Sequence, residues 1–173
     1  EYFRVPPRAD EELAAQPRRF LHKVFHTLSG AGNYFDVFNY PPGTAYIDAM
    51  AEPPPLPWPW LSELELEFFV SEYSRSGFTG GLNWYRSFDL KWAQRKPFEG
   101  VQSAVPAYFL GSEHDVDLEG FHGDDPIAQM RAIFPELREV RMIPGAGHMV
   151  QLEASDAVNA ILLDYLQDIS QRL

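Results

Sequence analysis

Pro106-Ala107-Tyr108-Phe109-Leu110-Gly111-Ser112-Glu113-His114-Asp115 is the stretch of sequence that decides the fold class. It begins with a short apolar run bounded by Pro and Gly, as is typical of a buried strand, and a carboxylate follows that run. A second strand is predicted at residues 140–143, and Pro144-Gly145-Ala146-Gly147 should end it just before His148.

Helices are predicted around these two strands. One covers residues 126–134, between the strands, and an amphipathic helix follows His148. The apolar stripe of that last helix consists of Val158, Ile161, Leu162, Tyr165, Leu166 and Ile169. The order strand, helix, strand, helix predicts an α/β fold with parallel strands joined by right-handed crossovers. Two strands alone cannot cover their own faces, so we expect this half to need further strands.

The residues before this region predict helices and loops. One helix is expected from Ala9 to about Leu28, ended by Ser29-Gly30. Pro53-Pro54-Pro55-Leu56-Pro57-Trp58-Pro59-Trp60 closes the loop that follows, because prolines without N–H groups propagate neither a helix nor a central strand. We interpret this loop as a spacer, with a proline-motif ligand for a partner domain as the alternative.

Two more helices are predicted before residue 100. Ser62 and Glu65 form a capping box that opens a helix through Tyr73, and Gly77 ends it. Another helix is expected over residues 82–94. Helices and loops before about residue 100 are followed by alternating strands and helices, so the domains expected are residues 1–100 and 101–173.

The composition narrows the functional classes. Of 173 residues, 45% are hydrophobic, which suits one domain or two small ones, and no apolar run reaches the roughly 18 residues of a membrane helix. The net charge of −11 disfavours nucleic-acid binding and favours a neutral substrate. The absence of Cys excludes disulfides and fits a cytoplasmic protein. Glu1 in place of Met suggests a cut or processed N-terminus.

His148 and Asp115 are the candidate catalytic pair, since each follows a predicted strand. Open α/β sheets place their sites at the carboxyl ends of strands, so the two side chains can come within hydrogen-bond reach. The carboxylate would fix the imidazole tautomer and leave the other ring nitrogen to act as a general base. The alternatives are an ordinary loop histidine and an Asp that caps a turn. Asp117 and Glu113 compete for the acid role.

Two clusters of potential metal ligands occur, and neither predicts a metal site. The first consists of His114, Asp115, Asp117 and Glu119. No second set of ligands at a recognisable spacing completes it. His22 and His26 lie one helical turn apart, but without the intervening Glu of the zinc pattern we interpret them as residues on a solvated face. No metal and no cofactor are therefore expected.

Trp84 and Tyr85 follow a Gly-rich turn, which suggests the wall of a cleft. A phenol can hydrogen-bond to an oxygen that is becoming an alkoxide and then protonate it, so Tyr85 is a candidate catalytic residue. Periodicity alone favours aromatic packing between helices instead.

Three motifs of the chain occur together in one known family. Ser76-Gly77-Phe78-Thr79-Gly80-Gly81-Leu82-Asn83-Trp84-Tyr85-Arg86 is similar to a cap-domain signature. Ser112-Glu113-His114-Asp115 is similar to an acid turn, and Gly145-Ala146-Gly147-His148, followed by Gln151, Glu153 and Val158-Asn159, is similar to a histidine turn and final helix. Together they resemble the epoxide hydrolase family of the α/β-hydrolase superfamily. The resemblance implies a helical cap followed by the last strands and helices of a parallel sheet.

The resemblance also implies hydrolysis of an epoxide to a vicinal diol through a covalent ester. Tyr85 would be one of two phenols that hold the epoxide oxygen, and His148, oriented by Asp115, would activate the water that cleaves the ester. The expected substrate-binding residues are Trp84, Val116 and Met149. Met149 stands where the family commonly has an aromatic residue.

The nucleophile is expected upstream of this chain. The family's nucleophile turn precedes the cap, and neither Gly-x-Asp-x-Gly nor Gly-x-Ser-x-Gly occurs in the sequence. Glu1-Tyr2-Phe3 is similar to the segment that follows the family's first cap tyrosine. The expected partners are an upstream part of the enzyme and a small neutral epoxide, with no nucleic acid and no membrane; a homodimer is left open. This chain alone is expected to be inactive.

Two other classes remain open. Another capped α/β-hydrolase, such as a haloalkane dehalogenase or a serine esterase, would share Asp115 and His148 but would not need Tyr85. A binding or scaffold module whose motifs are relics is the non-enzymatic alternative. An upstream Gly-x-Asp-x-Gly would favour the epoxide hydrolase, and Gly-x-Ser-x-Gly the esterase.

Overall fold

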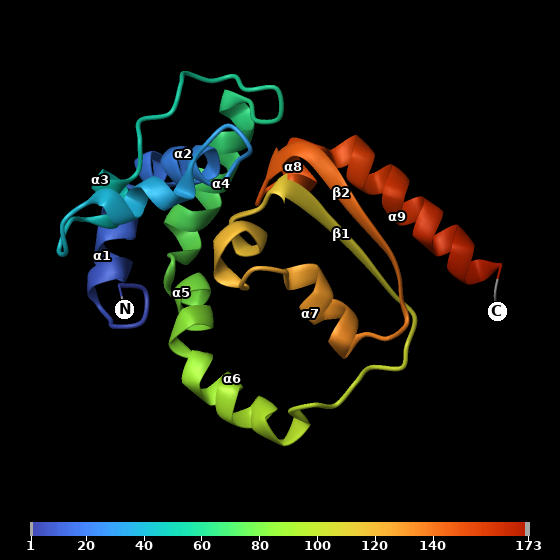
Figure 1. Ribbon diagram of the computed structural model, residues 1–173. Helices are drawn as coiled ribbons and strands as arrows, with labels where there is room; N and C mark the ends of the chain where they lie inside the picture. The colour runs from blue at the N-terminus through green and yellow to red at the C-terminus, as the bar shows by residue number, and fades with distance from the viewer. Residues whose placement is uncertain (1, 172–173) are drawn as a thin grey trace. The chain divides into compact units, whose positions relative to one another are not determined.

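Two compact units make up the computed structural model, which describes residues 2–171 (Figure 1). Within the described residues, the first unit contains 2–24 and 36–99, and the second contains 25–35 and 100–171. No sequence pattern indicated that residues 25–35 belong to the second unit. Glu1, which took part in the resemblance to a cap segment, lies outside the described residues.

The chain begins with two helices where the sequence predicted one, so that prediction was wrong. α1 (Arg8–Ala15) and α2 (Pro17–Thr27) are separated by Gln16, whose φ of −139° and ψ of 54° are not helical. Pro17 causes the break, because its ring disfavours a helical conformation of the preceding residue and it lacks the N–H that a continuous helix would use. Pro is nevertheless well suited to the first position of α2.

A long loop with two short helices follows α2. These are the 3-10 helix η1 (Tyr34–Asn39) and α3 (Tyr46–Ala49). In the proline-rich part of the loop, the indole N–H of Trp58 donates to the Pro54 carbonyl at 3.1 Å. The Trp58 ring also stacks on the imidazole of His22 in α2, with 5.1 Å between ring centroids. The contact with His22 holds the loop against α2 within the first unit.

The capping box predicted before α4 (Glu63–Ser76) is confirmed. The Ser62 hydroxyl accepts from the Glu65 N–H at 3.2 Å, and the Ser62 N–H donates to the Glu65 carboxylate at 2.7 Å. Gly77 ends the helix with a φ of 72°, a conformation that only glycine adopts without strain, and its N–H donates to the Tyr73 carbonyl at 2.8 Å.

The single helix predicted over residues 82–94 is instead two helices. α5 (Thr79–Arg86) begins earlier than predicted, and α6 (Phe88–Arg95) leads into the 3-10 helix η2 (Lys96–Phe98). Ser87 separates them with a φ of −89° and a ψ of 4°. Its hydroxyl donates to the Trp84 carbonyl at 2.9 Å, and such a local bond competes with continuation of a helix.

The second unit contains the two predicted strands, β1 (Ala107–His114) and β2 (Leu137–Gly147). They pair in parallel, as predicted, with Phe109 opposite Val140 and Ser112 opposite Ile143. Within the described residues the sheet has only these two strands. The helices around them are the π-helix η3 (Asp117–Phe121), α7 (Pro126–Ile133), α8 (Val150–Glu153) and α9 (Ser155–Ser170).

Pro144 and Gly145 do not end the second strand, contrary to the prediction. The next pair after Ser112 and Ile143 is His114 and Gly147, so β2 advances by four residues (147 − 143) while β1 advances by two (114 − 112). The extra residues form an irregularity that accommodates a proline and the positive φ of Gly145, 72°. The strand therefore continues up to His148.

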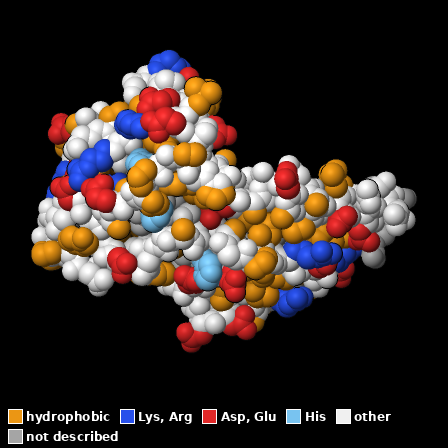
Figure 2. Space-filling model, turned by 90° about the horizontal axis from the view of Figure 1, so that it is seen from above, with side chains coloured by type: hydrophobic (Ala, Val, Ile, Leu, Met, Phe, Trp, Pro, Cys, Tyr) orange, Lys and Arg blue, Asp and Glu red, His pale blue; other side chains and the backbone are white. Residues whose placement is uncertain are grey.

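The core of the second unit lies between β2, α8 and α9. It is built from Ile143, Ala146, Val150 and Val158, with Leu110, Ala154 and Ile161 packed against them. The predicted stripe of α9 is only partly buried, since Leu162 is 46% and Leu166 is 62% exposed. A two-stranded sheet offers too little surface to cover the whole stripe. Figure 2 shows hydrophobic side chains exposed beside charged ones on one face of the molecule.

No helix within residues 2–171 combines the length and the apolar character needed to cross a membrane.

Candidate active site

Asp115 and His148 meet at the carboxyl edge of the two-stranded sheet. Asp115 directly follows β1, and His148 directly follows β2. Because neighbouring parallel strands end at the same edge, the two side chains converge there. Nδ1 of His148 lies 2.9 Å from Oδ1 of Asp115. An ionised carboxylate can only accept, so Nδ1 carries the proton and Nε2 is left with a free lone pair.

The pair stabilises its own charged form. Burial by itself would raise the pKa of Asp115, but the hydrogen bonds from the His148 ring and the Asp117 backbone N–H outweigh burial and hold that pKa below its usual value. The bond to Asp115 raises the pKa of His148 against the opposing effect of burial. An imidazole arranged in this way can take a proton from water, and the carboxylate stabilises the imidazolium that results.

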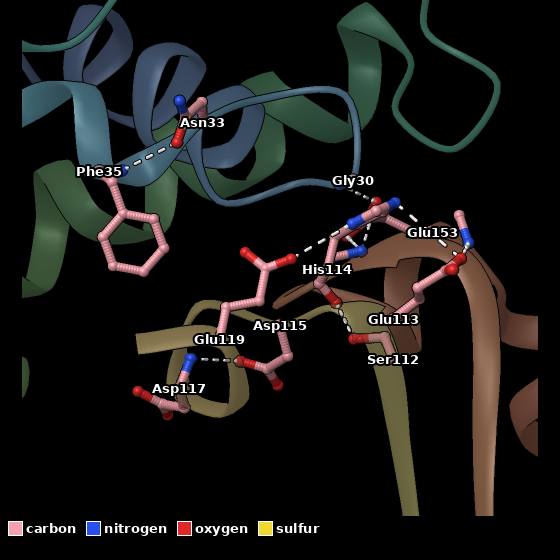
Figure 3. Close-up of polar contacts among 12 residues, drawn as sticks. Gly30, Asn33, Phe35, Ser112, Glu113, His114, Asp115, Asp117, Glu119 and Glu153 are labelled. Atoms are coloured by element: carbon pink, nitrogen blue, oxygen red, sulfur yellow. Dashed lines mark hydrogen bonds and ion pairs between the residues drawn. The ribbon is translucent and has the colours of Figure 1, made fainter. Parts of the chain in front are cut away.

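Of the two acids that compete with Asp115, Asp117 lies close to the pair, within 4.8 Å of its ligand atoms, and Glu113 is bound elsewhere. Glu113 accepts from the Gly145 N–H at 3.1 Å, and Glu119 contacts the His114 ring at 3.3 Å. The Asp117 N–H donates to Asp115 at 3.0 Å (Figure 3), a second hydrogen bond to the Oδ1 atom that contacts His148. Of these acids, Asp115 is the one whose carboxylate bonds the His148 ring.

The glycine turn before His148 is packed directly against residues 28–30. A Cβ atom on Gly147 would lie 2.4 Å from the carbonyl carbon of Ser29, so no larger residue fits there. The His148 N–H donates to the Leu28 carbonyl at 2.8 Å, and the Ser112 hydroxyl donates to the Gly147 carbonyl at 2.6 Å. The backbone on both sides of the imidazole is therefore held by hydrogen bonds.

Glu153 is a residue of the site to which the sequence analysis gave no role. Its carboxylate accepts from the Gly30 N–H at 2.8 Å and from the Gly147 N–H at 3.1 Å (Figure 3). The acid had been noted only as part of the resemblance of the final motif. No spacing rule links a carboxylate to backbone N–H groups of two distant segments, so no local pattern could have revealed these contacts.

Tyr85 and Trp84 lie on α5, in the first unit. Tyr85 is 40% exposed, and its ring lies 5.0 Å from that of Phe3 and 5.6 Å from that of Phe88. Trp84 is 60% exposed, with the Lys91 ammonium 3.1 Å from its ring centroid. Both rings are thus partly exposed, and Phe3 and Phe88 belong to the first unit as Tyr85 does.

Asp10 of α1 holds both ends of α5. Its carboxylate accepts from the Thr79 hydroxyl at 2.7 Å and forms an ion pair with Arg86, the first and last residues of the helix. These hydrogen bonds lower the pKa of Asp10 to about 2, the bond from Arg86 having the larger effect. Gly80 and Gly81 weaken a short helix of this kind, so an external anchor at each end contributes to its stability.

The other predicted substrate-binding residues lie beside the acid and the histidine. Val116, next to Asp115, is 7% exposed and precedes η3. Met149 is half-buried, and its carbonyl accepts from the Leu152 and Glu153 N–H groups at the start of α8. A substrate-binding role for either stays a prediction.

One group of potential metal ligands overlaps the acid–histidine pair. Ligand atoms of Asp115, Asp117 and His148 lie within 4.8 Å of one another. Oδ1 of Asp115 is already bonded to Nδ1 of His148 and to a backbone N–H, so a metal bound through these two atoms would break the pair. Among the described residues, His22, His26, His114 and Glu119 belong to no such group. We interpret the cluster as acid–base machinery.

Comparison with known proteins gives a consistent result over the whole chain, although no protein-family model matches the sequence. The chain is 36% identical to epoxide hydrolase A of Mycobacterium tuberculosis over 173 residues, which cover 99% of this chain and 52% of that protein. A crystal structure of epoxide hydrolase A from Mycobacterium thermoresistibile matches with a TM-score of 0.83 at 35% identity, covering 96% of this chain and 50% of that one.

An epoxide hydrolase from an endophytic Streptomyces matches with a TM-score of 0.88 at 30% identity, over 98% of this chain and 51% of that one. The chain therefore spans about half the length of the relatives that it matches. The matched structures have the α/β-hydrolase fold, and the matched part comprises the cap and parallel strands. This agrees with the fold class predicted from the sequence.

Proposed function

Over its whole length this chain is homologous to epoxide hydrolases of the α/β-hydrolase fold, and we propose that it supplies the acid, the histidine and one phenol of such an enzyme. The reaction is hydrolysis of an epoxide to a vicinal diol. The observation that carries the proposal is the 2.9 Å contact between His148 and Asp115 at the ends of two parallel strands.

The first step requires a carboxylate nucleophile, which the upstream part of the enzyme would provide. Its oxygen attacks one epoxide carbon, the C–O bond of the ring breaks, and an ester forms. The ring oxygen leaves as an alkoxide that must be stabilised and protonated. Tyr85 is the proposed donor, because a phenol can do both and the ring is partly exposed on α5.

The second step uses the acid–histidine pair. Nε2 of His148 takes a proton from water, and the hydroxide attacks the ester carbonyl. The acyl C–O bond then breaks, the diol leaves with the proton returned to its alkoxide oxygen, and the carboxylate nucleophile is regenerated. Asp115 keeps the proton on Nδ1 and stabilises the imidazolium. The product diol carries one oxygen from the epoxide and one from the carboxylate nucleophile. The oxygen of water takes the place of the oxygen that the carboxylate has lost.

The net charge of −11 supports a neutral substrate rather than an anion. The proposed partner is the polypeptide segment that carries the nucleophile. A cytoplasmic location and formation of a homodimer remain predictions from the sequence.

The function is tested by trapping the ester. In the enzyme that includes the nucleophile, we expect His148→Gln to open epoxides but not to hydrolyse the ester, so the protein gains the mass of one substrate molecule. His114→Gln is the matched control, because His114 contacts Glu119 rather than Asp115, and it should turn over without accumulating the adduct. A His148→Gln protein that never gains mass would remove His148 from the role of base.

A further inference from the structure

Both residues that flank His148 are bonded to Glu153, one to its side chain and the other to its backbone. On one side, the Gly147 N–H donates to the Glu153 carboxylate at 3.1 and 3.2 Å. On the other side, the Met149 carbonyl accepts from the Glu153 N–H at 2.9 Å. The chain from residue 147 to residue 153 is thereby closed into a ring that contains the histidine.

The same carboxylate ties this ring to a distant part of the chain. It accepts from the Gly30 N–H at 2.8 Å, across 123 residues of sequence. The backbones of Gly30 and Gly145 are packed very closely here, because a Cβ atom on Gly30 would lie 2.1 Å from the Gly145 carbonyl oxygen. The His148 N–H adds a second link by donating to the Leu28 carbonyl at 2.8 Å.

Backbone N–H groups in such tight contact need a partner within the protein, since a buried unpaired donor is costly. A carboxylate is well suited to this task, because its two oxygens accept several bonds and its charge strengthens each of them. Glu153 satisfies one donor on each of the two segments. Its removal would take this acceptor from both N–H groups while their backbones remain pressed together.

We propose that Glu153 is a positioning residue for the general base: it fixes the backbone on both sides of His148 and joins it to residues 28–30. The role in catalysis rests on the proposed function. The imidazole must keep Nδ1 on Asp115 while Nε2 faces the ester, and a small backbone displacement would disturb both contacts at once. Glu153 therefore acts on the hydrolysis step through His148 and touches no reacting atom.

Three variants separate positioning from charge. Glu153→Gln keeps the shape but offers only one acceptor oxygen, and Glu153→Asp keeps the charge but is one methylene too short to bridge both amides. Glu113→Gln is the matched control, because that carboxylate bonds to Gly145 in the same turn without contacting residues 28–30. Each variant is made in the 173-residue chain and in the enzyme that includes the nucleophile.

Two measurements apply to each variant. In the 173-residue chain, backbone hydrogen exchange is followed by NMR; we expect the Gly30 and Gly147 amides to exchange roughly tenfold to a hundredfold faster in both Glu153 variants and unchanged in the control. In the enzyme with its nucleophile, single-turnover kinetics should show slower decay of the ester by a similar factor, with formation of the ester unchanged.

The inference is overturned if exchange at Gly30 and Gly147 is unaffected by Glu153→Gln, or if Glu153→Asp behaves like the unmodified protein, which would indicate a role for charge alone. Equal slowing of both chemical steps, together with a lower Tm, would indicate a general structural role and would overturn it too. Failure of every form to make an ester would contradict the proposed function, while the exchange measurement would still decide whether Glu153 holds the two segments.

Discussion

Nδ1 of His148 and Oδ1 of Asp115 lie 2.9 Å apart although 33 residues separate them in the sequence, and each shifts the pKa of the other toward the charged pair. The folded pKa of His148 lies above its ordinary value of 6.5, so the stability it contributes is complete below that pH and is lost as the pH rises through the raised pKa. The folded pKa of Asp115 lies below 3.8, so its contribution is present above that value and is lost on further acidification.

The first prediction concerns the pH dependence of the base. Hydrolysis of the ester requires neutral His148, so its rate should rise with pH through a pKa above 6.5. Asp115→Asn removes the negative charge that favours the imidazolium and raises this pKa, so the acid limb should move to lower pH while the maximal rate falls. NMR titration of the His148 ring and the pH profile of ester decay measure both effects. An unchanged ring pKa in Asp115→Asn would contradict the coupling.

The second prediction concerns Tyr85 and the opening of the ring. An epoxide oxygen leaves as a basic alkoxide, so loss of one phenolic donor should slow alkylation by roughly tenfold to a thousandfold in Tyr85→Phe. The loss should be partial, because a second phenol is expected. Decay of a preformed ester should change much less. Single-turnover kinetics separate the two steps.

Tyr73→Phe is the control for that experiment, because Tyr73 lies on α4 with its ring stacked on Phe78 at 4.8 Å. It should leave alkylation unchanged. If Tyr85→Phe also leaves alkylation unchanged, Tyr85 is a packing residue, and a haloalkane dehalogenase or a serine esterase becomes the better interpretation.

The third prediction concerns the anchor of α5. Asp10→Asn should lower the Tm at neutral pH, because the carboxylate that bonds Thr79 and Arg86 loses its charge. The pKa of Asp10 is lowered from 3.8 to about 2, so its contribution is lost as the pH falls through that value. The difference in Tm between the two proteins should therefore shrink between pH 3.8 and about 2. A constant difference over that range would argue against the ion pair.

The fourth prediction is that the 173-residue chain alone does not turn over epoxides. It contains the proposed acid, base and one phenol but no recognisable nucleophile turn. Diol formation by the purified chain, measured by mass spectrometry without any partner protein, would contradict this. Adding the segment that carries the nucleophile is the positive control.

The meeting of Asp115 and His148 could be predicted because it follows from topology. Two parallel strands that are neighbours in a sheet end at one edge, and a side chain directly after each strand must lie near that edge. The capping box of Ser62 and Glu65 was predictable for a similar reason, since its hydrogen bonds join residues three positions apart.

The errors arose where one residue outweighs a periodic pattern. Pro17 interrupts an otherwise continuous apolar periodicity, and Ser87 divides the helix predicted over residues 82–94. Pro144 and Gly145 were interpreted as a strand end, yet an irregular strand pairing accommodates both. In each case the residue type was visible in the sequence, but its effect depended on the backbone geometry around it.

The contacts of Glu153 could not be predicted, since they join a side chain to backbone groups that any sequence possesses. The exposed stripe of α9 was not predicted for a different reason. An apolar periodicity identifies which residues of a helix favour burial, but it does not reveal whether the described sheet is wide enough to cover Leu162 and Leu166.

The membership of residues 25–35 in the second unit determines where this protein can be divided. A polypeptide that starts at Gly100 would contain both strands and the histidine but would lack the Leu28 carbonyl and the Gly30 N–H. The turn before His148 would then lose its packing partner, however intact the sheet remained. Any attempt to express this unit by itself must supply the missing segment, for example by joining residues 25–35 to it through a flexible linker.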